Sequence, residues 1–280
     1  MLERAGCGSD VATIEDIPVL RQVVVWVTLE NEDPRVLRLL GLLQVQGASW
    51  LTVHEDRFTE AEMRGARLLV MQSNGECEID GGVEWGTTYD LAKGCPACGT
   101  GAPQTSALLL NGEQIARLEG QHAAATYHWH HLVDERIATE LTRIGATGLE
   151  LRSVYGVTPD QRQTKLRWKQ MIASRVLPPM SSKTTGLIRE RACVVCGRNG
   201  YFTNVHHEPP RFVYHEADLR EIPDVSVSWE NVGYAILERE LRESLLSKPW
   251  MLVSPRVRQV FVDAGVTCFD WTPIRVEAAD

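Results

Sequence analysis

Residues 95–99 read Cys-Pro-Ala-Cys-Gly, and residues 193–197 read Cys-Val-Val-Cys-Gly. In each stretch two intervening residues bring both sulfurs to one side of a tight turn, and the following glycine tolerates the positive φ that such a turn requires. Zinc prefers four ligands in a tetrahedron, so two turns complete one closed structural site with no position left for a catalytic water. The predicted ligands of this zinc ion are Cys95, Cys98, Cys193 and Cys196.

The two motifs are separated by 94 residues, far more than in an ordinary zinc ribbon. A shared site must therefore join distant parts of the fold. The alternative is two separate turns whose cysteines are small core residues or thiol-redox pairs. The other cysteines, Cys7, Cys77 and Cys268, are isolated in the sequence and are interpreted as packing residues.

A second internal similarity surrounds two short helices. Residues 131–137 (HLVDERI) begin a predicted helix that ends at Gly145, and 120 positions later residues 251–257 (MLVSPRV) begin another that ends at Gly265. A capping residue precedes each helix, and each closing glycine tolerates the positive φ of a helix C-terminus. Capped helix-to-strand joints resemble one another in many proteins, but the ungapped matches favour an internal duplication.

The duplication predicts an α+β protein of two related halves, each with mixed or antiparallel sheets and flanking helices, tied by a pair of zinc knuckles that supply four cysteine ligands. We expect residues 1–155 to carry the first knuckle and residues 156–280 the second. Residues 165–172 fit a strand or a helix equally well. Residues 235–246 read as an amphipathic helix.

The region before the first motif carries no recognisable chemistry. It alternates a predicted buried strand at 23–27, a helix that begins at Asp33-Pro34 and stops at Gly47, and a strand at 50–53. A short helix at 59–64 and a strand at 68–71 follow.

Bulk composition limits the class of function. The chain has 280 residues, 44% of them hydrophobic, and a formal net charge of -8. This balance disfavours nucleic acid and suits a basic protein partner. No apolar run is long enough for a membrane helix, and no apolar segment precedes Cys7 as a signal peptide would require. Seven cysteines without an export signal indicate reduced thiols, so we expect a cytoplasmic protein.

Two histidine groups are candidates for a metal or catalytic site. His128 and His130 would share one face of a strand, although packing is the simpler role for them. His206 and His207 follow the second motif, an arrangement that resembles HNH nucleases, in which a histidine pair activates water and holds a metal. Asn231 is the candidate for the asparagine of that family, but the further cysteine pair and histidine are missing. The sequence therefore predicts no catalytic residue.

With both motifs in view, residues 89–280 resemble the double-CXXCG-motif family, a myxobacterial paralogous family partly known as swarm-inhibition-type immunity proteins. The resemblance is carried by residues 95–99 and 193–197 and by the closing segment from Leu252 to Thr267. It implies a non-enzymatic bacterial protein that binds and neutralises a cognate toxin, with zinc as the cofactor. The acidic residues expected to face that partner are Glu216, Asp218, Glu221 and Asp224. A zinc-stabilised scaffold or defence regulator, or a degenerate HNH-like nuclease, is the alternative.

Overall fold

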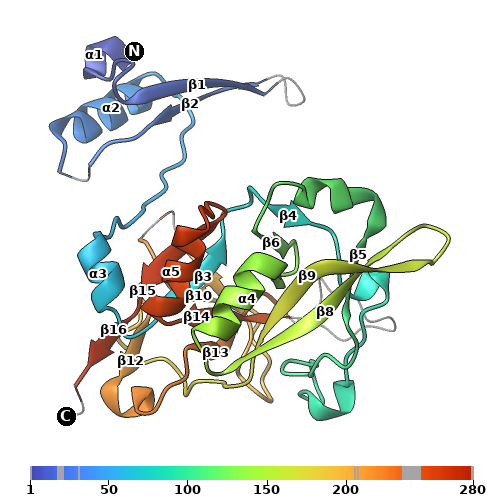
Figure 1. The fold of residues 1–280 in the computed structure, drawn as a ribbon. Coiled ribbons are helices and arrows are strands. Elements are labelled where there is room, and N and C mark those ends of the chain that lie inside the picture. The colour runs from blue at the N-terminus through green and yellow to red at the C-terminus, as the bar shows by residue number, and fades with distance from the viewer. Residues whose placement is uncertain are drawn as a thin grey trace. The chain divides into compact units, whose positions relative to one another are not determined.

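The computed structural model describes residues 2–17, 22–30, 32–204, 206, 208–234 and 247–278. The chain divides into two compact units, Met1–Val53 and His54–Asp280, and each is described by itself (Figure 1). None of the helices in the described ranges combines the length and the apolar composition needed to span a bilayer.

The first unit is an antiparallel β-hairpin with two helices. As predicted, the second helix begins after Asp33, whose side chain accepts a hydrogen bond from the Arg35 backbone N–H, and the chain leaves the helix at Gly47, where φ is 62°. The elements are α1 (Leu2–Ala5), β1 (Ala12–Ile17), β2 (Gln22–Val27) and α2 (Pro34–Val45).

Strand β2 is not buried, contrary to the prediction. Val25 is 42% exposed and Trp26 is 53% exposed. The physical reason is that β2 pairs only with β1, and a two-stranded sheet has no second layer to cover its apolar side chains. Residues 50–53, predicted to be a strand, have no regular structure.

The second unit is an α+β fold, as the sequence predicted, with two six-stranded sheets. Sheet I has the order β4-β6-β7-β9-β8-β5, and sheet II has the order β10-β11-β13-β14-β3-β15. The strands of sheet I are β4 (Glu78–Ile79), β5 (Leu108–Asn111), β6 (Ala123–Thr126), β7 (His131–Asp134), β8 (Leu149–Val157) and β9 (Gln163–Ala173). Those of sheet II are β3 (Leu69–Ser73), β10 (Leu187–Arg189), β11 (Tyr201–Thr203), β13 (Val225–Val232), β14 (Lys248–Val253) and β15 (Phe269–Pro273).

The remaining elements are short or cover the sheets. Helix α3 starts with a capping box at Thr59, close to its predicted position. The other elements are α3 (Glu60–Gly65), α4 (Glu135–Arg143), α5 (Pro255–Asp263), the paired strands β12 (Val213–His215) and β16 (Arg275–Glu277), and the 3-10 helices η2 (Val83–Trp85), η3 (Leu91–Lys93), η4 (Gly112–Leu118) and η5 (Glu216–Leu219).

The duplication predicted from the helices extends to whole sheets. Helices α4 and α5 are 120 positions apart at both ends, and Gly145 and Gly265 both follow them with positive φ. Asp134 caps α4 by accepting from the Ile137 N–H, whereas Ser254 stands at the equivalent position of α5 and its hydroxyl donates to Asp224 instead. The helix positions are the same in both copies, but the capping contact is not.

Strand register shows the same correspondence. In sheet I, residues 149–153 of β8 pair with 173–169 of β9, and in sheet II residues 269–273 of β15 pair with 73–69 of β3. The neighbouring strands agree as well, because β7 lies against β6 and β9 in the register in which β14 lies against β13 and β3. The order β6-β7-β9-β8 is thus equivalent to β13-β14-β3-β15.

This equivalence reveals an exchange of strands between the copies. Along the chain, the first repeat (residues 69–157) runs β3, first knuckle, β6, β7, α4, β8, and the second repeat (residues 163–273) runs β9, second knuckle, β13, β14, α5, β15. In space, β3 lies in the sheet of the second repeat and β9 in the sheet of the first. Each repeat therefore supplies its first strand to the sheet of the other.

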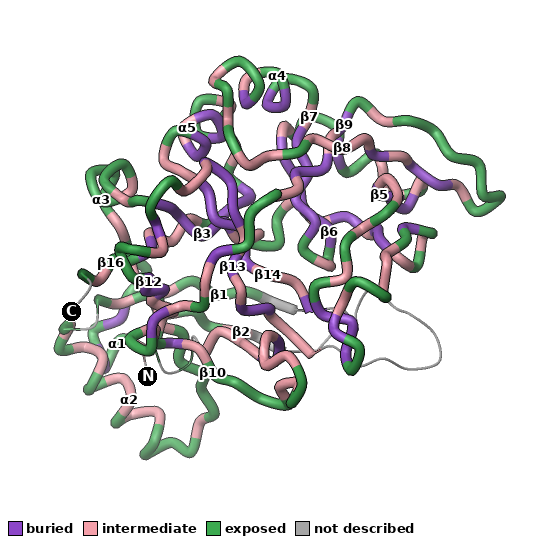
Figure 2. Tube along the Cα trace, turned by 90° about the horizontal axis from the view of Figure 1, so that it is seen from below, coloured by how far each residue is buried: buried purple, intermediate pink, exposed green. Residues whose placement is uncertain are grey.

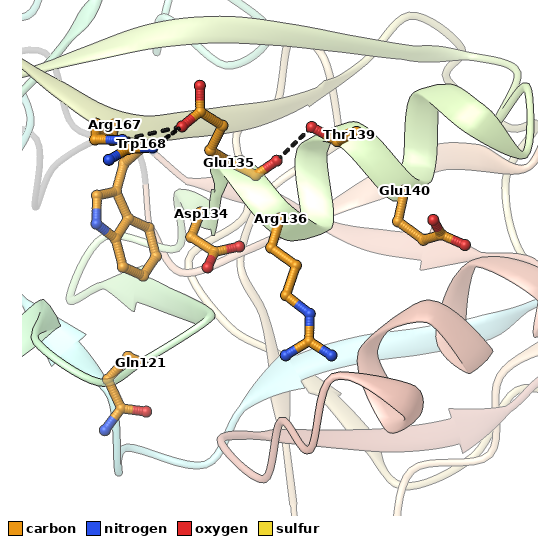
Figure 3. A pocket seen from close by; sticks show the side chains of 8 residues that line it. All are labelled: Gln121, Asp134, Glu135, Arg136, Thr139, Glu140, Arg167 and Trp168. Carbon is orange, nitrogen blue, oxygen red and sulfur yellow. Dashed lines mark hydrogen bonds and ion pairs between the residues drawn. The ribbon is translucent and has the colours of Figure 1, made fainter.

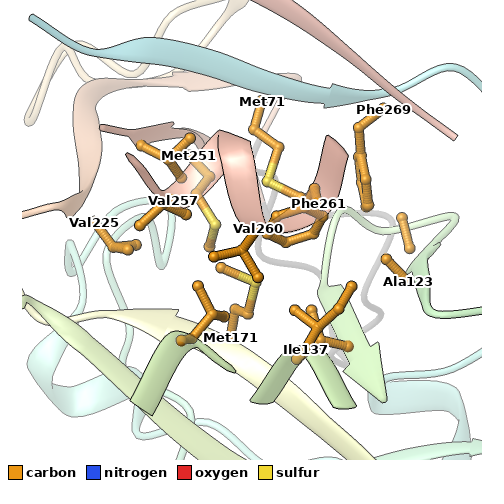
Figure 4. Close-up of a cluster of buried hydrophobic side chains, with 14 of the residues drawn as sticks. Met71, Ala123, Ile137, Met171, Val225, Met251, Val257, Val260, Phe261 and Phe269 are labelled. Atoms are coloured by element: carbon orange, nitrogen blue, oxygen red, sulfur yellow. The ribbon is translucent and has the colours of Figure 1, made fainter. Parts of the chain in front are cut away.

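The main core lies between the two repeats. Figure 4 shows Met71 and Met251 of sheet II facing Met171 of sheet I, with side chains of α4 and α5 between them. Buried residues concentrate on the central strands of both sheets (Figure 2). The buried residues of the cluster include five equivalent pairs: Met71 and Met171, Ala123 and Val225, Val133 and Val253, Ile137 and Val257, and Leu141 and Phe261. Alternate residues of the same strands, such as Leu132 and Leu252, enter separate clusters, because successive side chains point to opposite faces of a sheet.

The expected division at residue 155 is not a division into compact units. It falls inside β8, which forms a hairpin with β9 through the turn at 158–162. The exchanged strands join both repeats into one unit, and the separate unit is the N-terminal segment. Residues 165–172, whose pattern fits a strand and a helix equally, belong to strand β9. The helix predicted at 235–246 lies outside the described residues.

Candidate metal centre

The structure brings together all four cysteines predicted to be ligands. Their sulfurs lie within 4.8 Å of one another. The Sγ atoms of Cys95 and Cys193 are 3.9 Å apart, and those of Cys98 and Cys196 are 3.7 Å apart. A tetrahedral ion with metal–sulfur bonds of about 2.3 Å separates its sulfurs by about 3.8 Å. The four thiols therefore have the spacing of a four-cysteine metal site and can hold one ion.

Each motif forms the same tight turn. The N–H of Gly99 donates to the Cys95 carbonyl oxygen at 2.7 Å, and the N–H of Gly197 donates to the Cys193 carbonyl oxygen at 2.9 Å. Both glycines have positive φ, 72° and 66°, as expected for the residue after a knuckle. The second turn is closed further by the side-chain oxygen of Asn199, which accepts from the Cys193 N–H at 2.7 Å.

Backbone donors and burial act differently on the thiols. Hydrogen bonds from the N–H groups of Cys196 and Val195 lower the pKa of Cys193 to about 7. Burial raises the pKa of Cys98 to about 12, and Cys98 is only 3% exposed. Metal ligation requires thiolates, so a cation must replace the protons of the buried thiols. Cys193 is less buried than Cys98, and its pKa is lower, so its thiol is a suitable entry point for that exchange.

The site joins the two repeats symmetrically. Cys95 faces Cys193 and Cys98 faces Cys196, and the two members of each pair hold equivalent positions in the two knuckles. An ion bound here has two ligands from each repeat and no open position. Such an ion would cross-link the strand-exchanged repeats.

Hydroxyl groups connect the site to strand β14. The hydroxyl of Thr100 lies 3.1 Å from the Cys98 sulfur and 3.1 Å from the hydroxyl of Ser247, the residue before β14. Thr100 and Ser247 are both buried. Sequence reasoning missed these supporting groups, and it missed Asn199, because a single hydroxyl or amide near a cysteine is not a recognisable pattern.

The other three cysteines lie apart from this centre. Cys268 is buried, and its thiol donates to the Ala123 carbonyl oxygen, while the half-buried Cys77 donates to Gln121. Cys7 is buried in the first unit. All seven cysteines are free thiols.

The histidine candidates do not assemble a site with the cysteines. His130 is buried in a turn rather than on a strand face, and its ring nitrogens are within hydrogen-bond distance of Tyr89 Oη (2.7 Å) and Thr126 Oγ1 (2.9 Å). His206 is exposed, and His207 lies outside the described residues. Asn231 is buried and its amide donates to the Ser247 carbonyl oxygen, so its amide already holds a structural contact.

A pocket of about 640 Å³ lies at the start of α4 (Figure 3). Its charged groups are engaged locally: Glu135 pairs with Arg167 at 2.6 Å, and Asp134 caps the helix and contacts His122 at 2.8 Å. The pocket combines charges of both signs without a set of groups that converges on one point. We assign it no chemistry.

The acidic residues expected to face a partner are not one exposed patch. Glu216 and Glu221 are exposed and Asp218 is half-buried, but Asp224 is buried. Asp224 accepts from the N–H and hydroxyl of Thr147, from Ser254 and from Arg256. Its carboxylate therefore joins the end of α4 to the start of α5.

Comparison with known proteins leaves the family open. No protein-family model matches the chain, and no curated protein matches it.

Proposed function

We propose that the four-cysteine centre binds one structural zinc ion and that the protein is a non-enzymatic, cytoplasmic immunity protein. The observation that supports the zinc site most directly is the convergence of four sulfurs from two distant knuckles at tetrahedral spacing. Thiolate sets of this kind select zinc or iron, and zinc is the usual ion in paired Cys-x-x-Cys-Gly turns. Reduced thiols at all seven positions fit the cytoplasm.

Neutralisation of a toxin is supported by the resemblance to the double-CXXCG-motif family. A closed site of four cysteines fits this function, because four protein ligands leave no position for a substrate or a hydrolytic water. The protein then acts by binding: electrostatic attraction brings the toxin close, and a well-packed interface covers the toxin's active site. Zinc contributes by holding the binding surface in one conformation.

The test is protection of living cells. The chain is expressed together with candidate toxin domains from neighbouring reading frames, and growth is compared with cells that carry each toxin domain alone. The proposal predicts restored growth and a complex that co-purifies. No protection by a folded, zinc-loaded chain would contradict it.

A nuclease assay addresses the alternative activity. DNA cleavage by the purified protein that is lost on His206→Ala would favour the HNH-like function over the immunity function.

A further inference from the structure

The two knuckles differ in charge. Residues 183–211, around the second knuckle, carry five basic and two acidic side chains, in a chain whose formal net charge is -8. The equivalent residues around the first knuckle, 85–113, carry one basic and two acidic side chains. Both turns share the hydrogen bond from the glycine N–H to the first cysteine's carbonyl oxygen and the positive φ of that glycine, so this common geometry does not account for the difference in charge.

The tip of the second knuckle is also apolar and open. Val194 is 99% exposed and Val195 is 61% exposed. The knuckle stands beside β10, which is the edge strand of sheet II and exposes Ile188. Two exposed valines gain little from folding, and they offer apolar surface that a partner could cover.

Three arginines flank the second knuckle in the sequence, and each is held in place by an aromatic ring. Arg189 lies over the ring of Tyr201, and its guanidinium donates to the Gly197 carbonyl oxygen at 2.6 Å. Arg191 lies over the ring of Tyr234 at 5.3 Å, and Arg198 over the ring of Trp229 at 5.8 Å. A guanidinium that rests on an aromatic face loses little freedom on binding and keeps edge donors for a carboxylate.

Backbone strain supports a role for Arg191. Its φ is 47°, in the left-handed region that a side chain other than glycine seldom adopts. Such strain costs about 1–3 kcal/mol, persists only where the surrounding structure fixes the backbone, and is concentrated at functional sites. Here it directs an arginine next to the knuckle tip.

We propose that this second-knuckle face binds an acidic, partly apolar segment of a partner protein. The face consists of Ile188, Arg189, Arg191, Val194, Val195 and Arg198. Carboxylates of the segment pair with the arginines, and an apolar side chain covers the two valines. Nucleic acid fits less well, because the three aromatic rings that would stack on bases already carry arginines and the rest of the chain is acidic.

The inference goes beyond the proposed function, since it does not require the partner to be a toxin. Full-length, metal-loaded protein is titrated into a fluorescent peptide of alternating glutamate and leucine, and binding is followed by anisotropy. We expect Arg191→Glu to weaken binding about tenfold or more, because a charge pair at the contact becomes a repulsion. The matched control is Lys93→Glu, at the equivalent place before the first knuckle, which should bind like the wild type.

Val194→Ser should weaken binding without changing its dependence on salt, because it removes an apolar contact only. The melting temperature of each variant is measured first. If Arg191→Glu is destabilised, Arg191→Gln, which removes the charge without reversing it, is used in its place. Equal binding by the Arg191 and Lys93 variants would overturn the proposal. So would failure of the peptide to bind, or tighter binding of a single-stranded oligonucleotide of the same charge.

Discussion

The exchange of β3 and β9 predicts that the chain stays assembled after it is cut between its repeats. A protease site inserted at residues 159–161, in the exposed turn between β8 and β9, allows the folded protein to be cleaved. After cleavage, β3 still lies in the sheet of the second repeat and β9 in that of the first. Separation of the two pieces requires both strands to leave their sheets.

The buried side chains set the size of the effect. Leu68, Leu69, Val70 and Met71, in or next to β3, are at most 1% exposed, and Trp168 and Met171 of β9 are at most 9% exposed. At about 1.5–3 kcal/mol for each buried side chain, these six stabilise the assembly by about 9–18 kcal/mol. The shared core adds to this, against an association cost of about 4–15 kcal/mol. A net affinity of about 8 kcal/mol is enough to keep the pieces together at micromolar concentration.

Size-exclusion chromatography of the cleaved protein is the assay. We expect one peak that contains both pieces, and two peaks only in denaturant. The experiment is repeated with a chelator, because an ion bound at the four cysteines would also link the repeats. Separation under native conditions into two folded pieces would refute the exchange, and separation caused by the chelator alone would show that the strands contribute little.

Three substitutions test the metal centre and the contacts between repeats. Cys193→Ser should unfold or aggregate the protein, because structural zinc contributes about 10–16 kcal/mol in small domains and most proteins have a net stability of only about 5–15 kcal/mol. Cys77→Ser is the matched control. If the Cys193 variant melts at the same temperature as the wild type, the structural role is excluded. Burial raises the pKa of Asp224, but the hydrogen bonds of the arginine, threonine and serine around it outweigh burial and hold that pKa well below its usual range. Asp224→Asn should therefore lower the free energy of unfolding by about 1–3 kcal/mol at pH 7. The gap between wild type and variant should shrink as the pH falls below about 4, towards the lowered pKa. Urea midpoints of the two proteins that differ equally at pH 7 and pH 3 would contradict this. Gly148→Ala should destabilise the fold at least twice as much as Gly145→Ala. Both glycines have positive φ, but only at Gly148 would a Cβ collide with a carbonyl oxygen of β13. Equal decreases of the melting temperature in the two variants would show that no collision occurs.

The sequence predicts those parts of the fold whose signals are local. Asp33 and Thr59 mark helix starts because their side chains cap free N–H groups, and Gly145 and Gly265 mark helix ends because they adopt positive φ. The ligand set of the metal centre is also local in each half, since two cysteines and a glycine define one turn. That the two turns meet follows only from the preference of zinc for four ligands.

The strand exchange leaves no such signal. The apolar residues of β3 identify a buried strand but not the sheet that it enters, because both sheets offer an equivalent place between two antiparallel partners. Residues 165–172 are ambiguous in the sequence because their apolar residues fit both the two-residue period of a strand and the 3.6-residue period of a helix. The burial of β2 was predicted wrongly because its apolar sequence is typical of a covered strand, and only the topology shows that nothing in its own two-stranded sheet covers it.

Metal content of the purified, reduced protein is the most direct test of the central claim that sulfurs from both repeats bind one ion. Elemental analysis should give one zinc per chain for the wild type. Cys95→Ser and Cys196→Ser, which remove one ligand from each repeat, should each lose it. Absence of bound metal from the folded wild type, or two ions per chain with each knuckle binding its own, would contradict the claim.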